Sequence, residues 1–206
     1  MDNNPAQTFW DKVAVRYAAR PVRDAAAYEE TLADVAARLR PSDRVLEIGC
    51  GTGTTATRLG GGVAEWTGAD FSPGMVRIAQ AKPAPAGVRF ILSDADTVFD
   101  GSPFDAVCAF HLLHLVPDMR ATLAHVHDHL KPGGIFISKT WCFADLGLGM
   151  RMLIPVLRAF GLFPPANRLK AADLRQAITA AGFEIEVDRS FGRSPHCPYI
   201  VARKAG

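Results

Sequence analysis

The order of apolar and polar positions along the chain predicts alternating strands and helices. Short apolar runs are typical of strands that are buried on both faces of a sheet, whereas apolar residues recurring every three or four positions are typical of helices. The expected strands cover residues 44–48, 66–70, 88–92, 105–110, 135–140, 183–188 and 199–203. The expected helices cover residues 8–39 with a break at Pro21, 54–59, 73–81, 120–130 and 171–181.

This order of elements predicts an α/β fold with a doubly wound, mostly parallel, seven-stranded sheet. Strands that alternate with helices form parallel sheets that carry helices on both faces. The loop between the last two expected strands is too short for a helix, so these strands should form a hairpin and place an antiparallel strand in the sheet. A chain of 206 residues fits a single domain, residues 1–206, with a proper core.

A glycine-rich loop follows the first expected strand. Gly49, Gly51 and Gly53 alternate with small residues directly after the apolar run. Glycine permits a tight turn and lets a ligand lie against the backbone. The helix expected at residues 54–59 begins at once, so its free N–H groups point back at the same place. The loop therefore predicts a site for a nucleoside-bearing cofactor.

Composition and charge narrow the class of protein. The formal net charge is only +2 and no basic cluster is present, which argues against a nucleic-acid partner. The four cysteines are scattered, as expected for a protein of the reducing cytoplasm. The polar N-terminus does not look like a signal peptide, and no apolar run is long enough to span a membrane. We therefore expect a cytoplasmic location and no stable membrane insertion.

Four motifs together carry a family resemblance. They are residues 47–53 (Glu-Ile-Gly-Cys-Gly-Thr-Gly), Asp70, the pair Asp94-Ala95 and the Lys-Pro-Gly-Gly sequence at 131–134. In this spacing they resemble class I S-adenosylmethionine-dependent methyltransferases, and most of all the small-molecule branch that includes the ubiquinone/menaquinone biosynthesis type. The resemblance implies S-adenosylmethionine as cofactor and a small-molecule methyl acceptor, with direct displacement at the methyl group.

The resemblance also implies which residues bind the cofactor. Asp70 would accept hydrogen bonds from the ribose hydroxyls, and Asp94 would receive the adenine amino group, although Asp96 competes for that role. Glu47 would orient the cofactor from beneath the loop; the alternative is that it only caps loop N–H groups. Met75 is as compatible with helix packing as with cofactor contact. The full set is Tyr17, Glu47, Gly49, Cys50, Gly51, Gly53, Asp70, Phe71, Met75, Asp94, Ala95 and Phe110.

The N-terminal residues 1–40 resemble the opening segment of the family, which folds over the cofactor as a lid. Tyr17 would then hydrogen-bond the methionine carboxylate, and Arg20 or Arg23 would pair with it. Ordinary amphipathic packing is the alternative. A lid of this kind would exclude water and complete the site when ligands bind.

Two histidines are candidates for a catalytic base. His111 and His114 follow the fourth expected strand, where substrates of this family meet the methyl group, and imidazole titrates near neutral pH. Alternatively, one orients the loop and the other packs beneath it. The histidines at 125, 127 and 129 lie on a helix, where 127 points away from the other two, so we expect no metal site.

Residues 141–170 form an apolar segment between the cofactor-binding core (41–140) and the closing helix and hairpin (171–206). The segment follows the fifth strand, at the edge of the sheet where ligands bind. It either roofs an apolar pocket for a hydrophobic or aromatic acceptor or, over residues 146–163, contacts a second copy or a membrane surface. Arg151 and Arg158 lie seven residues apart on one helical face. They are able to meet an anionic substrate group, but solvated arginines are the safer expectation. Monomer and homodimer both stay open.

Two other functions fit parts of the sequence. Residues 51–56 satisfy the G-x-G-x-x-A pattern of nicotinamide oxidoreductases, with Asp70 downstream. Glu47, Asp94 and the closing hairpin argue against that function. A non-catalytic protein that binds cofactor or a partner is the other alternative. Binding of S-adenosylhomocysteine, of NAD(P) or of neither distinguishes the three.

Overall fold

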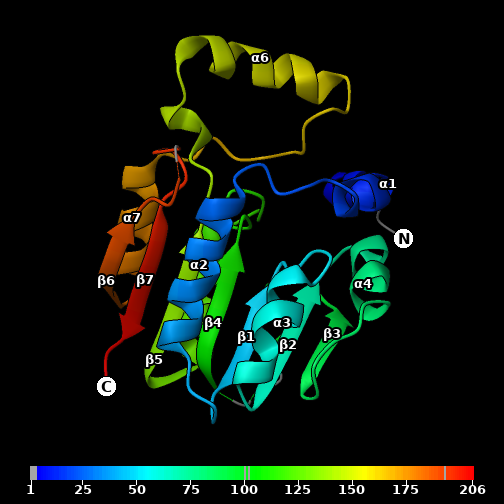
Figure 1. The fold of residues 1–206 in the computed structure, drawn as a ribbon. Coiled ribbons are helices and arrows are strands. Elements are labelled where there is room, and N and C mark those ends of the chain that lie inside the picture. Colours follow the sequence, from blue (N-terminus) through cyan, green and yellow to red (C-terminus); the bar gives the residue numbers. More distant parts are fainter. Residues whose placement is uncertain (1–3, 100, 102, 193) are drawn as a thin grey trace.

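A seven-stranded sheet forms the centre of the protein, with the strand order β3-β2-β1-β4-β5-β7-β6 (Figure 1). The structure is a computed structural model that describes residues 4–99, 101, 103–192 and 194–206. The strands are β1 (Arg44–Ile48), β2 (Glu65–Asp70), β3 (Val88–Leu92), β4 (Phe104–Phe110), β5 (Leu130–Lys139), β6 (Phe183–Arg189) and β7 (Tyr199–Lys204). Strands β1 to β5 pair in parallel, and β7 lies antiparallel between β5 and β6. The predicted fold class is confirmed.

Seven α-helices of the described residues surround or extend this sheet. They are α1 (Pro5–Ala18), α2 (Ala25–Arg38), α3 (Thr54–Leu59), α4 (Pro73–Gln80), α5 (Met119–His129), α6 (Leu148–Ala159) and α7 (Ala171–Ala180). Ser72 caps α4 by accepting the Met75 N–H at 3.2 Å, and Pro73 takes the first turn, where its missing N–H costs nothing. The expected N-terminal helix is indeed divided, between Ala18 and Ala25.

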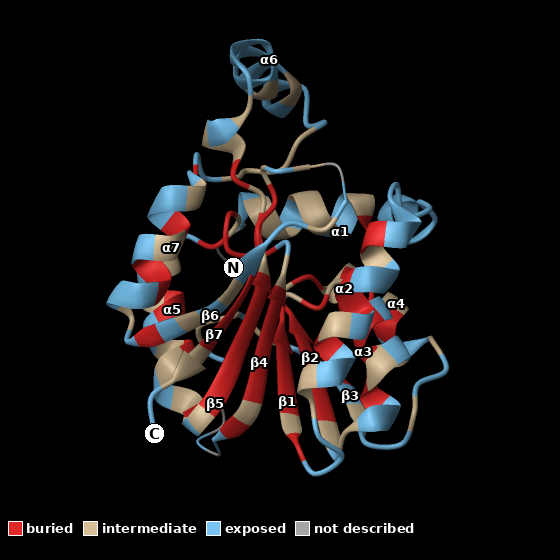
Figure 2. Cartoon of the chain, turned by 60° about the vertical axis from the view of Figure 1, so that its left-hand side comes forward, coloured by how far each residue is buried: buried red, intermediate tan, exposed pale blue. Residues whose placement is uncertain are grey.

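The core is divided into two layers by the sheet. On one face, buried residues of β1, β4 and β5 pack against α5 and α7, through side chains such as Leu123 and Leu174. On the other face, the same strands and β2 pack against α2, α3 and α4, through side chains such as Val35 and Val76. Figure 2 shows the strands as the most buried part of the chain. This double burial explains why the strands read as continuous apolar runs.

The start of β5 differs from the expectation. The expected strand starts at residue 135, after the Lys-Pro-Gly-Gly sequence, but β5 begins at Leu130. The pairing with β4 shifts register between Phe104 and Ala106, so this sequence forms a bulge within the strand. Gly133 has a φ of 75°, which favours glycine at such a bulge.

Helix α6 stands apart from the two layers. It extends beyond the carboxyl ends of the parallel strands, on the side where α1 also lies (Figures 1 and 2). None of its residues is buried. Among the described residues, no helix is both long and apolar enough to cross a bilayer.

Candidate functional site

The carboxyl ends of β1 and β4 form the centre of the candidate site. The two strands are neighbours, and the chain leaves them toward opposite sides of the sheet order, which makes this a topological switch point. In open α/β sheets, ligands bind in the crevice at this point. The glycine loop follows β1, and His111 and His114 follow β4, so the fold brings the two predicted groups together.

The three glycines of the loop have different physical requirements. All three lie in the left-handed region, with φ values of 67°, 54° and 73° for Gly49, Gly51 and Gly53. A Cβ on Gly49 would lie 2.6 Å from Leu112 Cδ1, and one on Gly53 would lie 2.6 Å from the Phe90 ring. A Cβ on Gly51 would meet nothing within 4 Å. The backbone at Gly51 is therefore open to a ligand.

Asp70 ties the loop to the start of α4. Its Oδ2 accepts the Gly51 N–H at 2.8 Å and its Oδ1 accepts the Ser72 N–H at 2.9 Å. Burial raises the pKa of this carboxyl, while the two hydrogen bonds act in the opposite direction. One carboxylate thus fixes the loop and presents its remaining lone pairs at the end of β2. Phe71, which follows Asp70 in the chain, is partly exposed.

Glu47 lies beneath the loop and is almost completely buried, at 2% exposure. Its Oε2 accepts the Trp66 indole N–H at 3.2 Å, and it also interacts with the Thr55 hydroxyl and the Ala56 N–H in the first turn of α3. Burial raises the pKa of Glu47 to about 8. The backbone N–H among these partners belongs to α3, not to the loop. Both roles considered for Glu47, orienting the cofactor and capping the loop, stay predictions.

Two other predicted residues have side chains in the core. Cys50 is buried against Gly68, and its N–H donates to the Ala69 carbonyl at 2.9 Å, so that only its backbone belongs to the loop surface. Met75 is 2% exposed in α4. Helix packing accounts for Met75, as the sequence allowed.

Asp94 and Asp96, the two candidates for binding the adenine amino group, lie in the turn after β3 and make different contacts. Asp96 accepts a hydrogen bond from the Thr122 hydroxyl of α5 at 2.7 Å. Asp94 is exposed, and its Oδ1 accepts only the Asp96 N–H, at 3.2 Å, among the interactions of described residues. Ala95 packs against the core beside it. Asp94 is therefore the more available carboxylate.

Helix α1 is fastened across α4 by polar contacts that the sequence did not reveal. Asp11 Oδ1 accepts the Gly74 N–H at 2.9 Å and also accepts the Ser72 hydroxyl. Gln7 donates to the Phe71 carbonyl at 2.7 Å. These partners are more than sixty residues apart, so no local pattern reports them. Both contacts hold the helix beside Asp70.

Tyr17 is close to the same carboxylate. It is 46% exposed and meets Trp10 edge-to-face at 5.9 Å. Burial and the nearby charge of Asp70 raise the pKa of Tyr17. Helix α1 therefore lies beside Asp70, and the Tyr17 hydroxyl is protonated at neutral pH. The role of this helix as a lid stays a prediction.

His111 occupies a strained position at the end of β4, directly after the partly exposed Phe110. Its φ is 56°, a conformation that costs energy in a residue other than glycine. Its N–H donates to the Lys139 carbonyl at 2.6 Å, and its Nδ1 lies 3.8 Å from the Cys197 thiol. Strain of this kind persists where the surroundings impose it, and it often marks functional sites.

His111 is exposed to solvent at the end of β4. Desolvation by the surrounding protein atoms lowers its pKa to about 4, with a further contribution from Lys139. The imidazole is neutral at pH 7 and accepts hydrogen bonds well, but it is a weak base.

His114 lies beneath the site. It is 4% exposed, meets Phe143 edge-to-face at 5.1 Å, and its Nδ1 has no partner among the described residues. Burial lowers its pKa to about 3, with a further contribution from His111. The two predicted catalytic histidines therefore differ: His111 is exposed and His114 is buried.

The histidines at 125, 127 and 129 do not converge, because His127 points away from the other two. His125 and His129 both contact Phe99, whereas His127 contacts Phe183 of β6. Among the residues that the structure describes, no group of three or more metal-ligating side chains gathers at one point.

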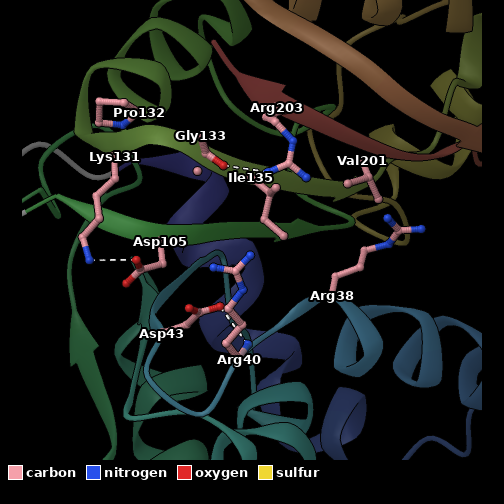
Figure 3. Close-up of a pocket in the computed structure, with 11 residues that line it drawn as sticks. Arg38, Arg40, Asp43, Asp105, Lys131, Pro132, Gly133, Ile135, Val201 and Arg203 are labelled. Carbon is pink, nitrogen blue, oxygen red and sulfur yellow. Dashed lines mark hydrogen bonds and ion pairs between the residues drawn. The ribbon is translucent and has the colours of Figure 1, made fainter. Parts of the chain in front are cut away.

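A cavity of about 360 Å³ lies where β1 and β5 begin, at the opposite end of the strands from the glycine loop (Figure 3). Lys131 pairs with Asp105 at 2.7 Å, and Arg203 donates to the Gly133 carbonyl at 2.7 Å. The Arg40 N–H donates to Asp43 at 2.8 Å. Internal contacts occupy Lys131, Asp105, Asp43 and Arg203, and the cavity is remote from the glycine loop, so it is not part of the site.

Comparison with known proteins identifies the family. A family model described as a methyltransferase domain matches residues 18–187. The chain belongs to the S-adenosylmethionine-dependent methyltransferases. It is an enzyme of this class, with S-adenosylmethionine as its cofactor, and the oxidoreductase and non-catalytic alternatives are set aside.

Individual relatives agree with the family. The chain is 29% identical over 88% of its length to a ubiquinone biosynthesis O-methyltransferase of Xanthomonas axonopodis, of which it covers 77%. It is 30% identical over 86% of its length to the O-methyltransferase cnsE of Penicillium expansum, of which it covers 64%, just under two thirds. A magnesium protoporphyrin IX methyltransferase from Synechocystis, solved with bound S-adenosylhomocysteine, has the same fold, with a TM-score of 0.71, 24% identity and coverage of 97% and 95% of the two chains.

Proposed function

We propose that this methyltransferase transfers the methyl group to a small apolar or aromatic acceptor by direct in-line displacement. The observation that carries the proposal is the row of rings leading away from the reacting edge. His111 stacks with Trp141 at 6.1 Å, and Trp141 stacks with Phe143 at 6.1 Å. Gly49 packs against Leu112, so this row starts next to the glycine loop.

The glycine loop and its neighbours fit the cofactor. The open backbone at Gly51, the carboxylates of Asp70 and Asp94 and the hydroxyl of Tyr17 all belong to one edge of the sheet. We assign the ribose to Asp70, the adenine amino group to Asp94 and the methionine portion to the loop and Tyr17. When bound, S-adenosylmethionine supplies an electrophilic methyl group on a positively charged sulfur.

The protein's own contribution is mainly positioning. An aligned nucleophile and the exclusion of water account for much of the barrier reduction in such a displacement. Neutral His111 accepts a hydrogen bond from the acceptor and orients it, while Trp141 and Phe143 exclude water on one side. Helix α1, fastened through Asp11, covers the cofactor side. With its pKa near 4, His111 removes a proton effectively only from an acidic acceptor.

The test is a transfer assay with a radiolabelled methyl donor. The acceptor panel should contain phenols, catechols, aryl amines and thiols, each paired with a polar analogue of similar size. We expect labelled product from apolar or aromatic members and little from their polar analogues. Transfer only to added protein or RNA would contradict the proposed acceptor class and leave the enzyme class intact.

A further inference from the structure

Helix α6 and the segment after it enclose a second cavity, of about 120 Å³. Part of its wall is apolar and comes from Phe143, Ile154, Pro155 and Phe163. The other part is strongly basic and polar, and consists of Arg151, Arg158, Arg168 and Asn167, with Ala166 between them. A small cavity that combines rings with several guanidinium groups is chemically distinctive, because guanidinium groups bind carboxylates and phosphates in paired geometry.

The three arginines of this cavity have no acidic partner among the described residues. Of the other described arginines, seven pair with carboxylates: Arg38, Arg44, Arg58, Arg89, Arg175, Arg189 and Arg203. Within the part of the chain that the structure describes, the remaining six are unpaired like those of the cavity, but none of them lines it: Arg16, Arg20, Arg23, Arg40, Arg77 and Arg120. The sequence contains no Asp or Glu from residue 146 to residue 172. The carboxylate just before this stretch, Asp145, accepts the Ala171 N–H at 2.7 Å. The positive charge of the cavity is therefore not neutralised by the protein itself.

Helix α6 brings basic and apolar side chains together on the cavity wall. Arg151, Ile154 and Arg158 all line the cavity. Ile154 is partly covered, whereas Arg151, Arg158 and Arg168 are exposed, so the basic part of the wall is open to a ligand that enters from solvent. Large apolar side chains are exposed elsewhere on the helix, including Met152 at 67% and Phe160 beyond its end at 75%.

The cavity connects with the reacting edge through aromatic contacts. Phe143 lines the cavity and meets Phe163 at 5.1 Å, and on its other side it stacks with Trp141, which stacks with His111. The buried His114, whose Nδ1 has no described partner, touches Phe143 as well. The Asn167 N–H donates to the His114 carbonyl at 2.7 Å, which fixes the cavity wall to the end of β4.

We propose that this cavity binds an anionic group of the methyl acceptor, a carboxylate, sulfonate or phosphate, through Arg151, Arg158 and Arg168. The apolar part of the acceptor then lies along Phe143 and Trp141, and its nucleophile reaches His111. This inference rests on the proposed function and specifies its substrate class as an amphipathic acid. Neither the family match nor the relatives assign such a subsite.

The experiment uses two fluorescent probes that differ in charge. The anionic probe is 1-anilinonaphthalene-8-sulfonate, and its uncharged analogue is N-phenyl-1-naphthylamine. Each is titrated into the full-length protein, into the triple variant Arg151→Gln, Arg158→Gln, Arg168→Gln, and into Arg120→Gln. The last is the matched control, because Arg120 is an exposed arginine on α5 outside the cavity.

We expect the triple variant to bind the sulfonate at least tenfold more weakly and the neutral probe within twofold of the unchanged protein. The control variant should change neither affinity by more than twofold. Unchanged sulfonate affinity in the triple variant, or an equal loss for both probes, would overturn the proposed subsite.

Calorimetry with S-adenosylhomocysteine separates this inference from the proposed function. Binding of S-adenosylhomocysteine should be the same in all three proteins, because the substituted arginines lie outside the glycine-loop edge. If the cofactor product binds but the probes fail to discriminate, only the anion subsite is wrong. If labelled methyl is transferred only to macromolecules, the acceptor class fails first, and the subsite fails with it.

Discussion

The glycine loop and helix α6 both lie at the carboxyl ends of the parallel strands, but different contacts hold them in place. At the loop, the buried carboxylate of Asp70 joins the backbone of Gly51 to the start of α4. In α6, no residue is buried, and the helix contributes both basic and apolar side chains to the wall of the small cavity. The edge that we assign to the cofactor is therefore fixed by the core. The part that we assign to the acceptor is added outside the core, where change costs little stability.

The largest expected effect is at Asp70. Asp70→Asn leaves one carbonyl oxygen for two backbone N–H groups and removes the charge that we assign to the ribose. Hydrogen bonds to a charged group contribute on the order of 1.5–3 kcal/mol, so affinity for S-adenosylhomocysteine should fall at least tenfold by calorimetry. Asp96→Asn is the control, since that carboxylate faces Thr122. Equal affinity in the Asp70 variant would remove this residue from the ribose role.

The next prediction concerns Glu47, beneath the glycine loop, and the pH dependence of the free energy of unfolding. Its pKa is raised to about 8 from an ordinary value of 4.5. Between these values the unfolded carboxyl is ionised while the folded one is protonated, so this group lowers the free energy of unfolding as pH rises, by up to about 1.4 kcal/mol per pH unit. Glu47→Gln should therefore lose less stability than the unchanged protein between pH 5 and 8, measured by urea unfolding. Parallel pH profiles for the two proteins would contradict the raised pKa.

The third prediction concerns turnover and His111, which lies between the glycine loop and the aromatic residues that lead to α6. We expect His111→Ala to lower kcat about tenfold, which is less than the roughly 10²–10⁴-fold contribution of a general acid or base, because we assign His111 to orienting the acceptor. S-adenosylhomocysteine affinity should stay within twofold. Because the pKa of His111 is lowered to about 4, the unchanged enzyme should show no break in kcat/KM from this group between pH 5.5 and 8. His125→Ala is a matched loss of imidazole on α5. Normal turnover of the His111 variant would make that residue structural.

The smallest expected effect is on the exposed side of the α6 segment. Phe160 is 75% exposed, so Phe160→Ser should change the free energy of unfolding by less than about 0.5 kcal/mol. Chemical denaturation provides the measurement. A loss well above 1 kcal/mol would mean that this side chain is covered in solution, and the contrast between the two regions would then fail.

The sequence predicted most of the fold because its signals are local. The five strands of the parallel part, the Ser72 cap and the closing hairpin all follow from apolar runs and neighbouring turn residues. The start of β5 was wrong, because Pro132 and Gly133 indicate a turn locally while pairing with β4 continues the strand through a bulge. Tertiary pairing outweighed the local preference there.

The candidate site was only partly predictable. Family resemblance placed the loop, Asp70 and the histidines at one edge, and the fold brings them together. The contacts of Asp11 with α4 and of Cys197 with His111 join residues 63 and 86 positions apart, so no sequence pattern reports them. The direction of the arginines in α6 depends on how the segment returns to the sheet, which periodicity does not encode. The roles of individual site residues and of the segment 141–170 stay predictions.

The most direct test is calorimetric titration of the purified protein with S-adenosylhomocysteine, with NAD(P)H titrated beside it. The central claim is that the edge formed by Gly51 and Asp70 binds the methyl donor. We predict micromolar, one-to-one binding of S-adenosylhomocysteine and no heat from the nicotinamide cofactors. Binding of NAD(P)H alone, or of neither ligand, would contradict the claim.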